Sequence, residues 1–316
     1  MSNRSWIDRL FRTCLKPFGL TPESVARRLG VIPTIAASVF VRQTSRLYDY
    51  IGTQPGLGHF LNVGWWEKSE DDWQPSSSFS MEKQCQALVR RVARRAGLDR
   101  ETRLLDVGFG YGEQDRIFLD EFNCGDIVGI NITSSQVEKA RELVGASSKA
   151  GRFHPHVGNA VRLPYPSNSF NTIVALESPF HFNTRQQFFD EAKRVLEPGG
   201  RLVTTDIINA KRKTETSVGG QFLEAAHNTY WQVCDENHCT VNQYNQRLRQ
   251  RGFQDVQVDD VTEQTLIPGI TRYIRWRASL QSSWLQWLIA PGVTVGLNFY
   301  RSGHLRYVIA SASNKG

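Results

Sequence analysis

Three side chains in the second half of the sequence have the types needed to hold a reacting molecule and move a proton. Glu177 and His181 follow an alternating apolar run that ends at Leu176, and Asp206 lies near the end of the run RLVTTDI. Ligands of an open α/β sheet bind beyond the carboxyl ends of the strands, where these side chains are expected. Histidine exchanges protons near neutral pH, so His181 is the candidate general base. Asp206 is the candidate carboxylate that orients or assists it, and Glu177 is a third catalytic candidate that would bind the reacting molecule.

Simpler interpretations of these residues stay open. His181 could be a surface or helix-capping histidine, and Glu177 could only cap a helix. Cys234 and Cys239, with His238 between them, invite a metal interpretation, but their spacing is not the usual CxxC and no second pair follows. We therefore expect reduced structural cysteines and no metal site.

A glycine-rich stretch, RLLDVGFGYGEQ at 103–114, precedes these candidates. A short apolar run leads into Asp106, and Gly108, Gly110 and Gly112 follow at alternate positions. Glycine suits a sharp turn against which a ligand lies without a Cβ in the way. The stretch lacks the lysine and hydroxyl of a phosphate-binding GxxxxGK[ST] loop, and its spacing differs from the dinucleotide GxGxxG pattern. It predicts the strand, turn and helix that begin a nucleotide-binding α/β unit.

The apolar periodicity predicts an alternating strand and helix order around this turn. The expected strands are Arg103–Val107, Asp126–Ile132, Arg152–Val157, Ser169–Leu176, Arg201–Ile207, Phe253–Val258 and His304–Ser313. The expected helices are Met81–Ala96, Glu113–Phe122, one capped by Thr133, Asp190–Leu196 and a helical insert over Thr262–Arg301. This order places the chain in the α/β class.

The domain limits follow from this order. Residues 1–80 are expected to hold N-terminal helices and a segment that covers the site, and 81–261 the sheet core. Residues 262–303 are the inserted helical cap, and 304–316 the final strand and tail. The N-terminal helices either pack on the core, which we favour, or contact a membrane in plane or cover an acyl group.

Several motifs resemble those of S-adenosylmethionine (SAM)-dependent methyltransferases of the Rossmann-like class. The stretches are DVGFGYG, GINITSSQ, GNAVRLP and RVLEPGG, and LNVGWW resembles a segment that precedes the glycine turn in small-molecule members acting on tocopherols, sterols and natural products. The resemblance implies a Rossmann-like sheet whose last strand is antiparallel. It also implies that SAM is the cofactor.

The resemblance further implies a set of cofactor-binding residues. It assigns the ribose to Asn131 with Gln136 beside it, and the adenine to Asn159 and Ala160. Both asparagines stand where the family usually has an acid. An amide oxygen can still accept a hydrogen bond, but it carries no charge. The full implied set is Asp106, Gly108, Gly110, Gly112, Asn131, Gln136, Asn159, Ala160 and Glu177.

The composition is that of an ordinary globular protein, with 40% hydrophobic and 22% charged residues. The net charge of +7 is concentrated at the two ends: residues 1–50 hold eight Lys or Arg against three acids, and 271–307 hold five Arg and no acid. Such ends fit an anionic acceptor or a peripheral membrane contact better than nucleic acid. Five scattered cysteines and the charged N-terminus favour a cytoplasmic protein without a signal peptide.

Together these observations predict a SAM-dependent methyltransferase of secondary metabolism with a small, partly apolar acceptor. The first choice is O-methylation of a natural-product or lipid-like hydroxyl, with His181 as base. C-methylation of an isoprenoid or aromatic ring is the first alternative, in which Glu177 would act and the arginine-rich cap could hold a diphosphate. A cyclase-like or scaffold protein that binds SAM without transferring methyl is the second. A homo-oligomer stays open.

Overall fold

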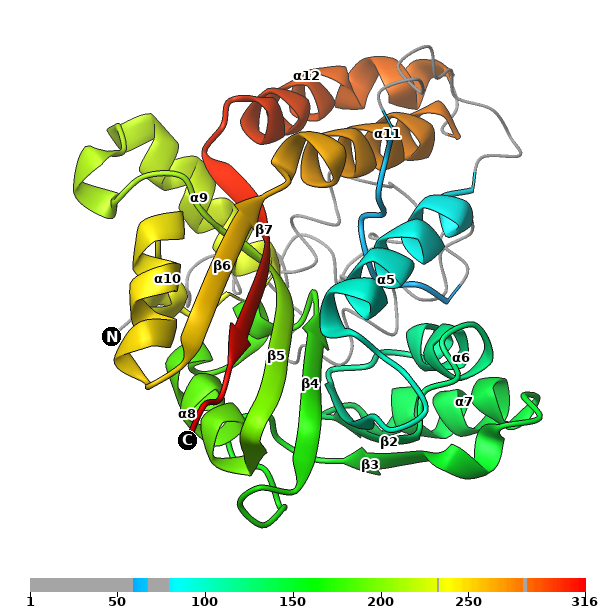
Figure 1. The fold of residues 1–316 in the computed structure, drawn as a ribbon. Coiled ribbons are helices and arrows are strands. Elements are labelled where there is room, and N and C mark those ends of the chain that lie inside the picture. The colour runs from blue at the N-terminus through cyan, green and yellow to red at the C-terminus, as the bar shows by residue number, and fades with distance from the viewer. Residues whose placement is uncertain (1–58, 68–79, 232, 281–282) are drawn as a thin grey trace, which may run out of the picture.

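The computed structural model describes residues 59–67, 80–231, 233–280 and 283–316. The predicted helices of residues 1–50 lie outside the described residues. In the described part, the chain forms one seven-stranded sheet with helices on both faces and a helical pair at one end (Figure 1).

The sheet has the strand order β3-β2-β1-β4-β5-β7-β6. The first five strands are parallel, whereas β7 runs antiparallel to β5 and β6 antiparallel to β7. The predicted Rossmann-like sheet with an antiparallel last strand is therefore confirmed. The strands are β1 (Arg103–Val107), β2 (Asp126–Asn131), β3 (Phe153–Val157), β4 (Phe170–Leu176), β5 (Leu196–Asn209), β6 (Gln254–Asp260) and β7 (Leu305–Ser313).

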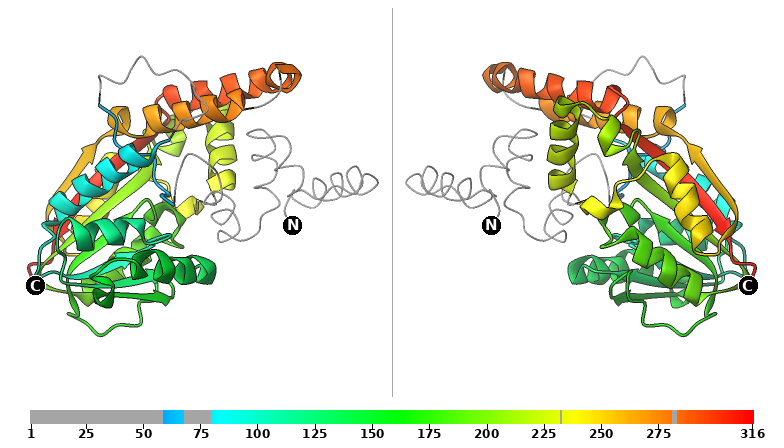
Figure 2. Two further views of the ribbon diagram at one scale, coloured as in Figure 1. Left: turned by 90° about the vertical axis from the view of Figure 1, so that its right-hand side faces the viewer. Right: turned by 90° about the vertical axis from the view of Figure 1, so that its left-hand side faces the viewer.

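The helices form layers on the two sides of the sheet and a pair across one of its ends (Figures 1 and 2). The α-helices are α5 (Glu82–Ala96), α6 (Glu113–Asp120), α7 (Ser134–Gly145), α8 (Arg185–Val195), α9 (Val218–Trp231), α10 (Val241–Gln250), α11 (Leu266–Ser279) and α12 (Ser283–Arg301). Short 3-10 turns include η4 (Pro179–His181), η6 (Asp235–Asn237) and η7 (Thr262–Gln264). The predicted insert is thus a helical pair, α11 and α12.

Two hydrophobic clusters cover the opposite faces of the sheet. Successive strand residues point to opposite faces, so Leu104 packs in the cluster with α5, α6 and α7, while Leu105 packs with α8 and α10. Both side chains are fully buried. Because helices cover both faces of the sheet with apolar side chains, a polar site is expected at the ends of the strands.

Two predicted boundaries differ from the structure for local reasons. Helix α8 begins at Arg185, not at 190, because Thr184 and Gln187 form a capping box that starts the helix earlier. Strand β5 begins at Leu196, because the backbone of 196–200 continues into the strand with a register shift against β4. Thr133 does precede α7, but its side chain makes no cap hydrogen bond.

The segment 59–67, called the cover segment below, lies between α5 and α11. The N–H of Trp65 donates to Gln84 O at 2.8 Å, and the N–H of Trp66 to Gln264 O at 2.8 Å. Arg91 lies 3.6 Å above the Trp65 ring and Arg272 4.5 Å above the Trp66 ring, so cations on two helices hold the two tryptophans. The aromatic pair is thereby packed against the core, and the residues before it reach the ends of the strands.

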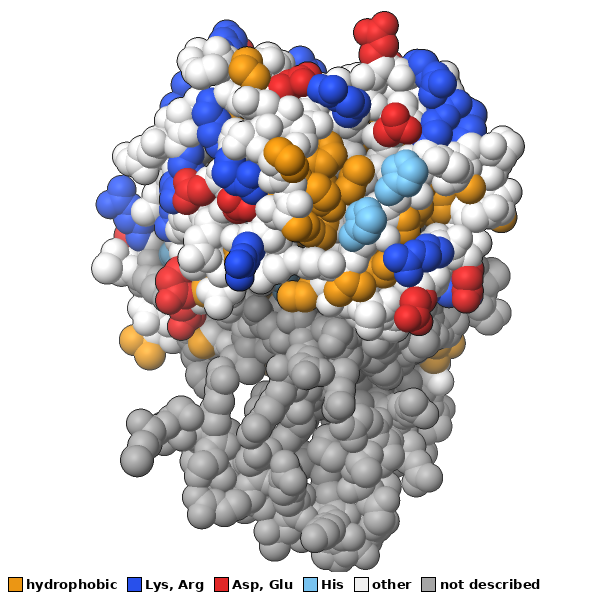
Figure 3. Space-filling view, turned by 90° about the horizontal axis from the view of Figure 1, so that it is seen from below, with side chains coloured by type: hydrophobic (Ala, Val, Ile, Leu, Met, Phe, Trp, Pro, Cys, Tyr) orange, Lys and Arg blue, Asp and Glu red, His pale blue; other side chains and the backbone are white. Residues whose placement is uncertain are grey.

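The surface of the described part mixes charges of both signs. On the face seen from below, Lys and Arg side chains lie among Asp and Glu, around a central group of hydrophobic side chains (Figure 3). Among the described residues, the helices are too short or too polar to cross a bilayer.

Candidate active site

A cavity of about 390 Å³ lies where the carboxyl ends of β1, β2 and β4 meet the cover segment. Backbone of the glycine turn forms one wall, and side chains from β2, β4 and the loops after them form the others. Most sequence candidates line it, namely Gly108, Gly110, Asn131, Gln136, Asn159, Ala160, Glu177 and His181. Asp106, Gly112 and Asp206 do not line this cavity.

The glycine turn needs glycine for two separate reasons. Gly108 has φ +82°, and a Cβ there would lie 2.4 Å from Ser178 Cβ. Gly112 also has φ +82°, and its Cβ would lie 3.0 Å from Ala140 Cβ on α7. Positive φ and close packing both disfavour any other residue. Gly108 therefore lets the loop after β4 approach the turn, and Gly112 lets α6 pack on α7.

Asp106 acts from behind the cavity wall. It is fully buried, and its Oδ2 accepts a hydrogen bond of 2.6 Å from Gln114 Nε2, a residue that does line the cavity. Burial raises the pKa of Asp106 to about 6, opposed by hydrogen bonds from Gln114 and from Asp115. Burial and the charge of Asp106 raise the pKa of Asp115 as well. Two neighbouring buried carboxylates disfavour each other's charge, so both pKa values lie above the ordinary range. The hydrogen bond from Gln114 to Asp106 fixes the Gln114 side chain at the cavity wall.

The β2 side of the cavity is lined by amides. Asn131 Nδ2 donates to Gln136 Oε1 at 2.8 Å and to Gly110 O at 3.3 Å. Its amide hydrogens are thus used within the protein, while the carbonyl oxygen can accept from a ligand. Asn159 lies farther along, where its Oδ1 accepts the N–H of Val161 at 3.0 Å.

Glu177 joins three parts of the chain at the end of β4. Its Oε1 accepts from Val63 N–H of the cover segment at 2.9 Å and from Tyr307 Oη of β7 at 2.8 Å. Its backbone adopts φ +48°, a conformation that non-glycine residues rarely adopt, and lies against Thr205. Burial raises the pKa of Glu177 to about 7, opposed by the hydrogen bonds from Val63 and Tyr307. This half-buried carboxyl group can take up or release a proton near neutral pH.

His181 ends η4 and lines the cavity beside Glu177. Burial lowers the pKa of His181 to about 3, a backbone hydrogen bond at Trp231 opposes this, and His227 adds to it. The imidazole is therefore neutral at physiological pH, the form that accepts a proton. His227 itself lies 3.2 Å from Tyr300 Oη through its Nδ1, so a residue of α9 that acts electrostatically on His181 also contacts α12.

Asp206 has a partner that the sequence did not reveal. Both of its carboxylate oxygens are bound by Arg185, with Nε to Oδ2 at 2.6 Å and Nη2 to Oδ1 at 3.0 Å. The pair is buried, at 0% exposure for Asp206 and 1% for Arg185. Burial raises the pKa of Asp206, and the guanidinium opposes the rise. Both carboxylate oxygens of Asp206 therefore accept hydrogen bonds from Arg185, whereas the sequence had led us to expect that this carboxylate orients His181.

Sequence reasoning missed several residues that shape the site. His59, Leu61 and Asn62 of the cover segment line the cavity, but only the segment as a whole was assigned that role. Tyr307, which binds Glu177, is a fully buried tyrosine in β7. A buried phenol needs a partner, so a tyrosine next to the apolar run 308–310 of this strand is a signal that could have been used.

Comparison with known proteins now identifies the family. Residues 105–204 match a family model described as a methyltransferase domain. The erythromycin 3''-O-methyltransferase of Saccharopolyspora erythraea is 31% identical over 220 residues, which cover 69% of this chain and 69% of the relative. The chain belongs to the SAM-dependent methyltransferases of class I.

Two further likenesses extend this result. The 27-O-demethylrifamycin SV methyltransferase of Amycolatopsis mediterranei is 28% identical over 256 residues, covering 80% of this chain and 92% of the relative. A geranyl diphosphate C-methyltransferase from Streptomyces coelicolor A3(2) shares the fold with a TM-score of 0.64 at 17% identity, covering 86% of this chain and 98% of that one. The enzyme is thus a SAM-dependent methyltransferase that uses SAM as its cofactor.

The cavity of this methyltransferase has the chemistry to fit SAM. The apolar side chain of Ile132 is 63% exposed at the cavity rim, where a flat base could cover it. Gln136 Nε2 is a buried donor without a partner among the described residues, which a ligand oxygen could satisfy. Carboxyl groups of Glu113 and Glu177 line the same cavity, and SAM carries positive charge. These features agree with the family assignment.

Proposed function

We propose that this methyltransferase transfers the methyl group of SAM to a hydroxyl group of a small, partly apolar natural product, with His181 accepting the hydroxyl proton. The observation that carries the proposal is the position of His181, a neutral imidazole that lines the cofactor cavity at the end of β4. The two curated relatives named above support oxygen as the methylated atom, since one is an O-methyltransferase and the other acts on a 27-O-demethyl compound.

The cofactor half of the cavity would hold SAM through groups that need no charge. The backbone of Gly108 and Gly110 would lie against the methionine part, with Asp106 and Gln114 fixing the turn behind it. Asn131 would accept from a ribose hydroxyl, and Ala160 would lie at the adenine beside Asn159. When bound, SAM supplies an electrophilic methyl group on a cationic sulfur.

A neutral imidazole of low basicity is sufficient for the proton transfer. As an alcohol oxygen gains a methyl group it becomes a much stronger acid, so its proton leaves readily to a weak base held within hydrogen-bond reach. His181 would take that proton on a ring nitrogen, and the positive charge would pass from the sulfur to the imidazole. The ring of Phe180 lies 4.1 Å from the imidazole ring, and Phe182 lines the cavity, so these side chains would limit the access of water to this step.

C-methylation is the second candidate, and Glu177 is the observation that favours it. With a pKa of about 7, this carboxylate could accept the proton of a carbon atom that is being methylated, at a position that His181 would not reach. The oxygen of Glu177 that binds Val63 and Tyr307 is already fixed. The other oxygen would then face the reacting carbon.

The test identifies the methylated atom directly. The enzyme would be incubated with SAM carrying a ¹³C methyl group and an extract of its source organism, and the labelled product examined by NMR. A methoxy carbon shift, lost with His181→Ala and kept with His154→Ala on the exposed face of β3, is the expected result. A label on carbon, or a methoxy product formed equally well by His181→Ala, would contradict the proposal.

A further inference from the structure

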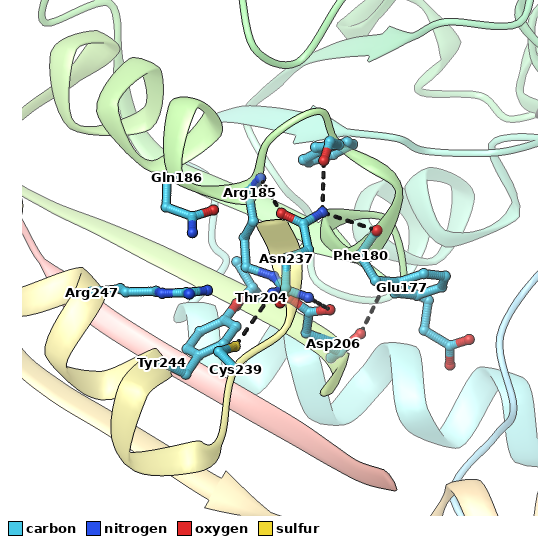
Figure 4. Close-up of polar contacts among 12 residues, drawn as sticks. Glu177, Phe180, Arg185, Gln186, Thr204, Asp206, Asn237, Cys239, Tyr244 and Arg247 are labelled. Carbon is cyan, nitrogen blue, oxygen red and sulfur yellow. Dashed lines mark hydrogen bonds and ion pairs between the residues drawn. The ribbon is translucent and has the colours of Figure 1, made fainter. Parts of the chain in front are cut away.

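Arg185 and Asp206 form the most completely buried ion pair of the described residues. The guanidinium binds the carboxylate through two parallel hydrogen bonds of 2.6 and 3.0 Å. Tyr244 closes one side, with its Oη 2.9 Å from Thr204 Oγ1, and its ring lies 5.4 Å from the guanidinium carbon (Figure 4). Such a pair is fixed in geometry, because each partner depends on the other for its solvation.

Asn237 connects this pair to the loop that carries His181. Its Oδ1 accepts the backbone N–H of Arg185 at 2.7 Å, and its backbone oxygen accepts from Arg185 Nη1. Its Nδ2 donates to Phe180 O at 3.1 Å and to Phe182 O at 2.7 Å. Asn237 is 1% exposed and lies between Arg185 and Phe180 in Figure 4. The side-chain amide of Asn237 therefore binds the backbone carbonyl groups of the residues before and after His181.

The loop around His181 has little regular structure of its own. Turn η4 is three residues long, and a 3-10 turn of that length is held by few hydrogen bonds. Locally, the N–H of His181 donates to Ser178 O at 3.0 Å and that of Phe182 to Pro179 O at 3.2 Å. The position of the imidazole therefore depends on contacts from elsewhere in the chain, and Asn237 supplies two of them.

We propose that Arg185, Asp206 and Asn237 form a positioning clamp that sets the place of His181 in the cavity. In this clamp Asp206 acts on Arg185, which holds Asn237, which holds the backbone at Phe180 and Phe182. Asp206 is thus a positioning residue and not a group that orients the imidazole. The proposal rests on His181 being the proton acceptor of the proposed function.

The rival account assigns Asp206 a direct action on His181. The two accounts differ in what Arg185 does. If Asp206 acts through Arg185, the damage in Asp206→Asn comes largely from a buried guanidinium left without its counter-ion. Replacing both charges with apolar side chains removes that damage, because neither charge is left alone and the Arg185 backbone N–H still holds Asn237. If Asp206 acts on the imidazole, the double replacement gains nothing.

The experiment measures kcat, the apparent KM for the acceptor and the SAM dissociation constant in four variants. They are Asn237→Ala, Asp206→Asn, the double variant Arg185→Met with Asp206→Leu, and the control Asn242→Ala on the exposed side of α10. We expect Asn237→Ala to lower kcat about tenfold to a hundredfold, because misplacing a reacting group by an ångström has effects of that size. SAM binding should stay within about twofold, since the clamp does not line the cofactor cavity.

Asp206→Asn should lose kcat to a similar extent, and the double variant should recover at least about fivefold over it. Hydrogen exchange at the amides of 180–184 should rise in Asn237→Ala, while exchange in β1 and α6 stays unchanged. A kcat for Asn237→Ala equal to that of the control, or a double variant no better than Asp206→Asn, would overturn the clamp. Failure of the proposed function is distinguishable, because then His181→Ala itself keeps its rate.

Discussion

At the ends of β1 and β2 the cavity is lined mainly by backbone and by the amides Asn131 and Gln136, with Glu113 as an acid at the start of α6. At the end of β4 it is lined by the ionisable groups of Glu177 and His181. The first region is assembled from neighbours in sequence, as in the bond from Gln114 to Asp106 eight residues before it. The second is assembled from distant ones, as in the bond from Tyr307 to Glu177 across 130 residues. A cofactor shared by a whole family can be held by a local motif, while the acceptor region depends on how the entire fold closes.

The largest expected effect on stability and cofactor binding falls on the local region. In Gly108→Ala the new Cβ would lie 2.4 Å from Ser178 Cβ at φ +82°, so both overlap and backbone strain oppose it. We expect a loss of about 2–4 kcal/mol, expressed as weaker SAM binding or a lower melting temperature. Calorimetric titration with SAM and thermal unfolding would measure it.

Gly199→Ala is a matched control for this prediction. Gly199 has φ +84°, almost the same backbone conformation, but a Cβ there would meet nothing within 4 Å. Only the strain of about 1 kcal/mol should appear. Equal losses in the two variants would show that close packing at Ser178 does not matter, and would contradict the proposed structure of the turn.

A second prediction concerns the charge of Glu177. Its pKa is raised from 4.5 to about 7 in the folded protein, so the protonated form is favoured by folding. The stability that this group contributes is fully present below the unfolded value of 4.5 and is lost as the pH rises through about 7. Glu177→Gln resembles the protonated form, so its melting temperature should rise relative to the parent between pH 5 and pH 8.

Thermal unfolding across that pH range would measure the difference, with Glu142→Gln on the exposed side of α7 as control. A difference that does not change with pH would show that Glu177 does not titrate in this range.

The methylation rate of the same Glu177→Gln variant distinguishes the two candidate bases. If methylation occurs on carbon with Glu177 as proton acceptor, its rate should fall at least about a hundredfold, and by less if His181 is the base.

The smallest expected effect falls on the amide pair. Asn131→Asp loses the donor that now binds Gln136 Oε1 at 2.8 Å, but the Gln136 amide can turn and donate its own hydrogens to the new carboxylate. One exchanged hydrogen bond corresponds to about 1 kcal/mol, so SAM affinity should change less than about tenfold. Titration beside Asn242→Asp as control would measure it. A larger loss of SAM affinity would mean that cofactor binding depends on the particular hydrogen bonds of Asn131, just as the β4 end of the cavity depends on those of Glu177.

The extent to which sequence predicted this enzyme follows the same division. The glycine turn, the seven strands and the cofactor depend on short stretches whose residues are close in sequence, and these were predicted. The start of α8 was missed although Thr184 and Gln187 carry a capping-box pattern, a local signal that was available. The partner of Asp206 had no local signal, because Arg185 lies 21 residues before it in α8 and meets it only where α8 packs on β5. Asn237 lies a further 52 residues from Arg185 along the chain.

The most direct test of the account separates cofactor binding from methyl transfer at His181. The single-turnover rate of methyl transfer and the SAM dissociation constant would be measured for the parent enzyme, His181→Ala and the exposed control His154→Ala. The account predicts a rate lower by about a hundredfold to ten-thousandfold in His181→Ala, with SAM affinity unchanged and the control unaffected. A parental rate in His181→Ala, or a loss of rate that follows a loss of SAM affinity, would contradict it.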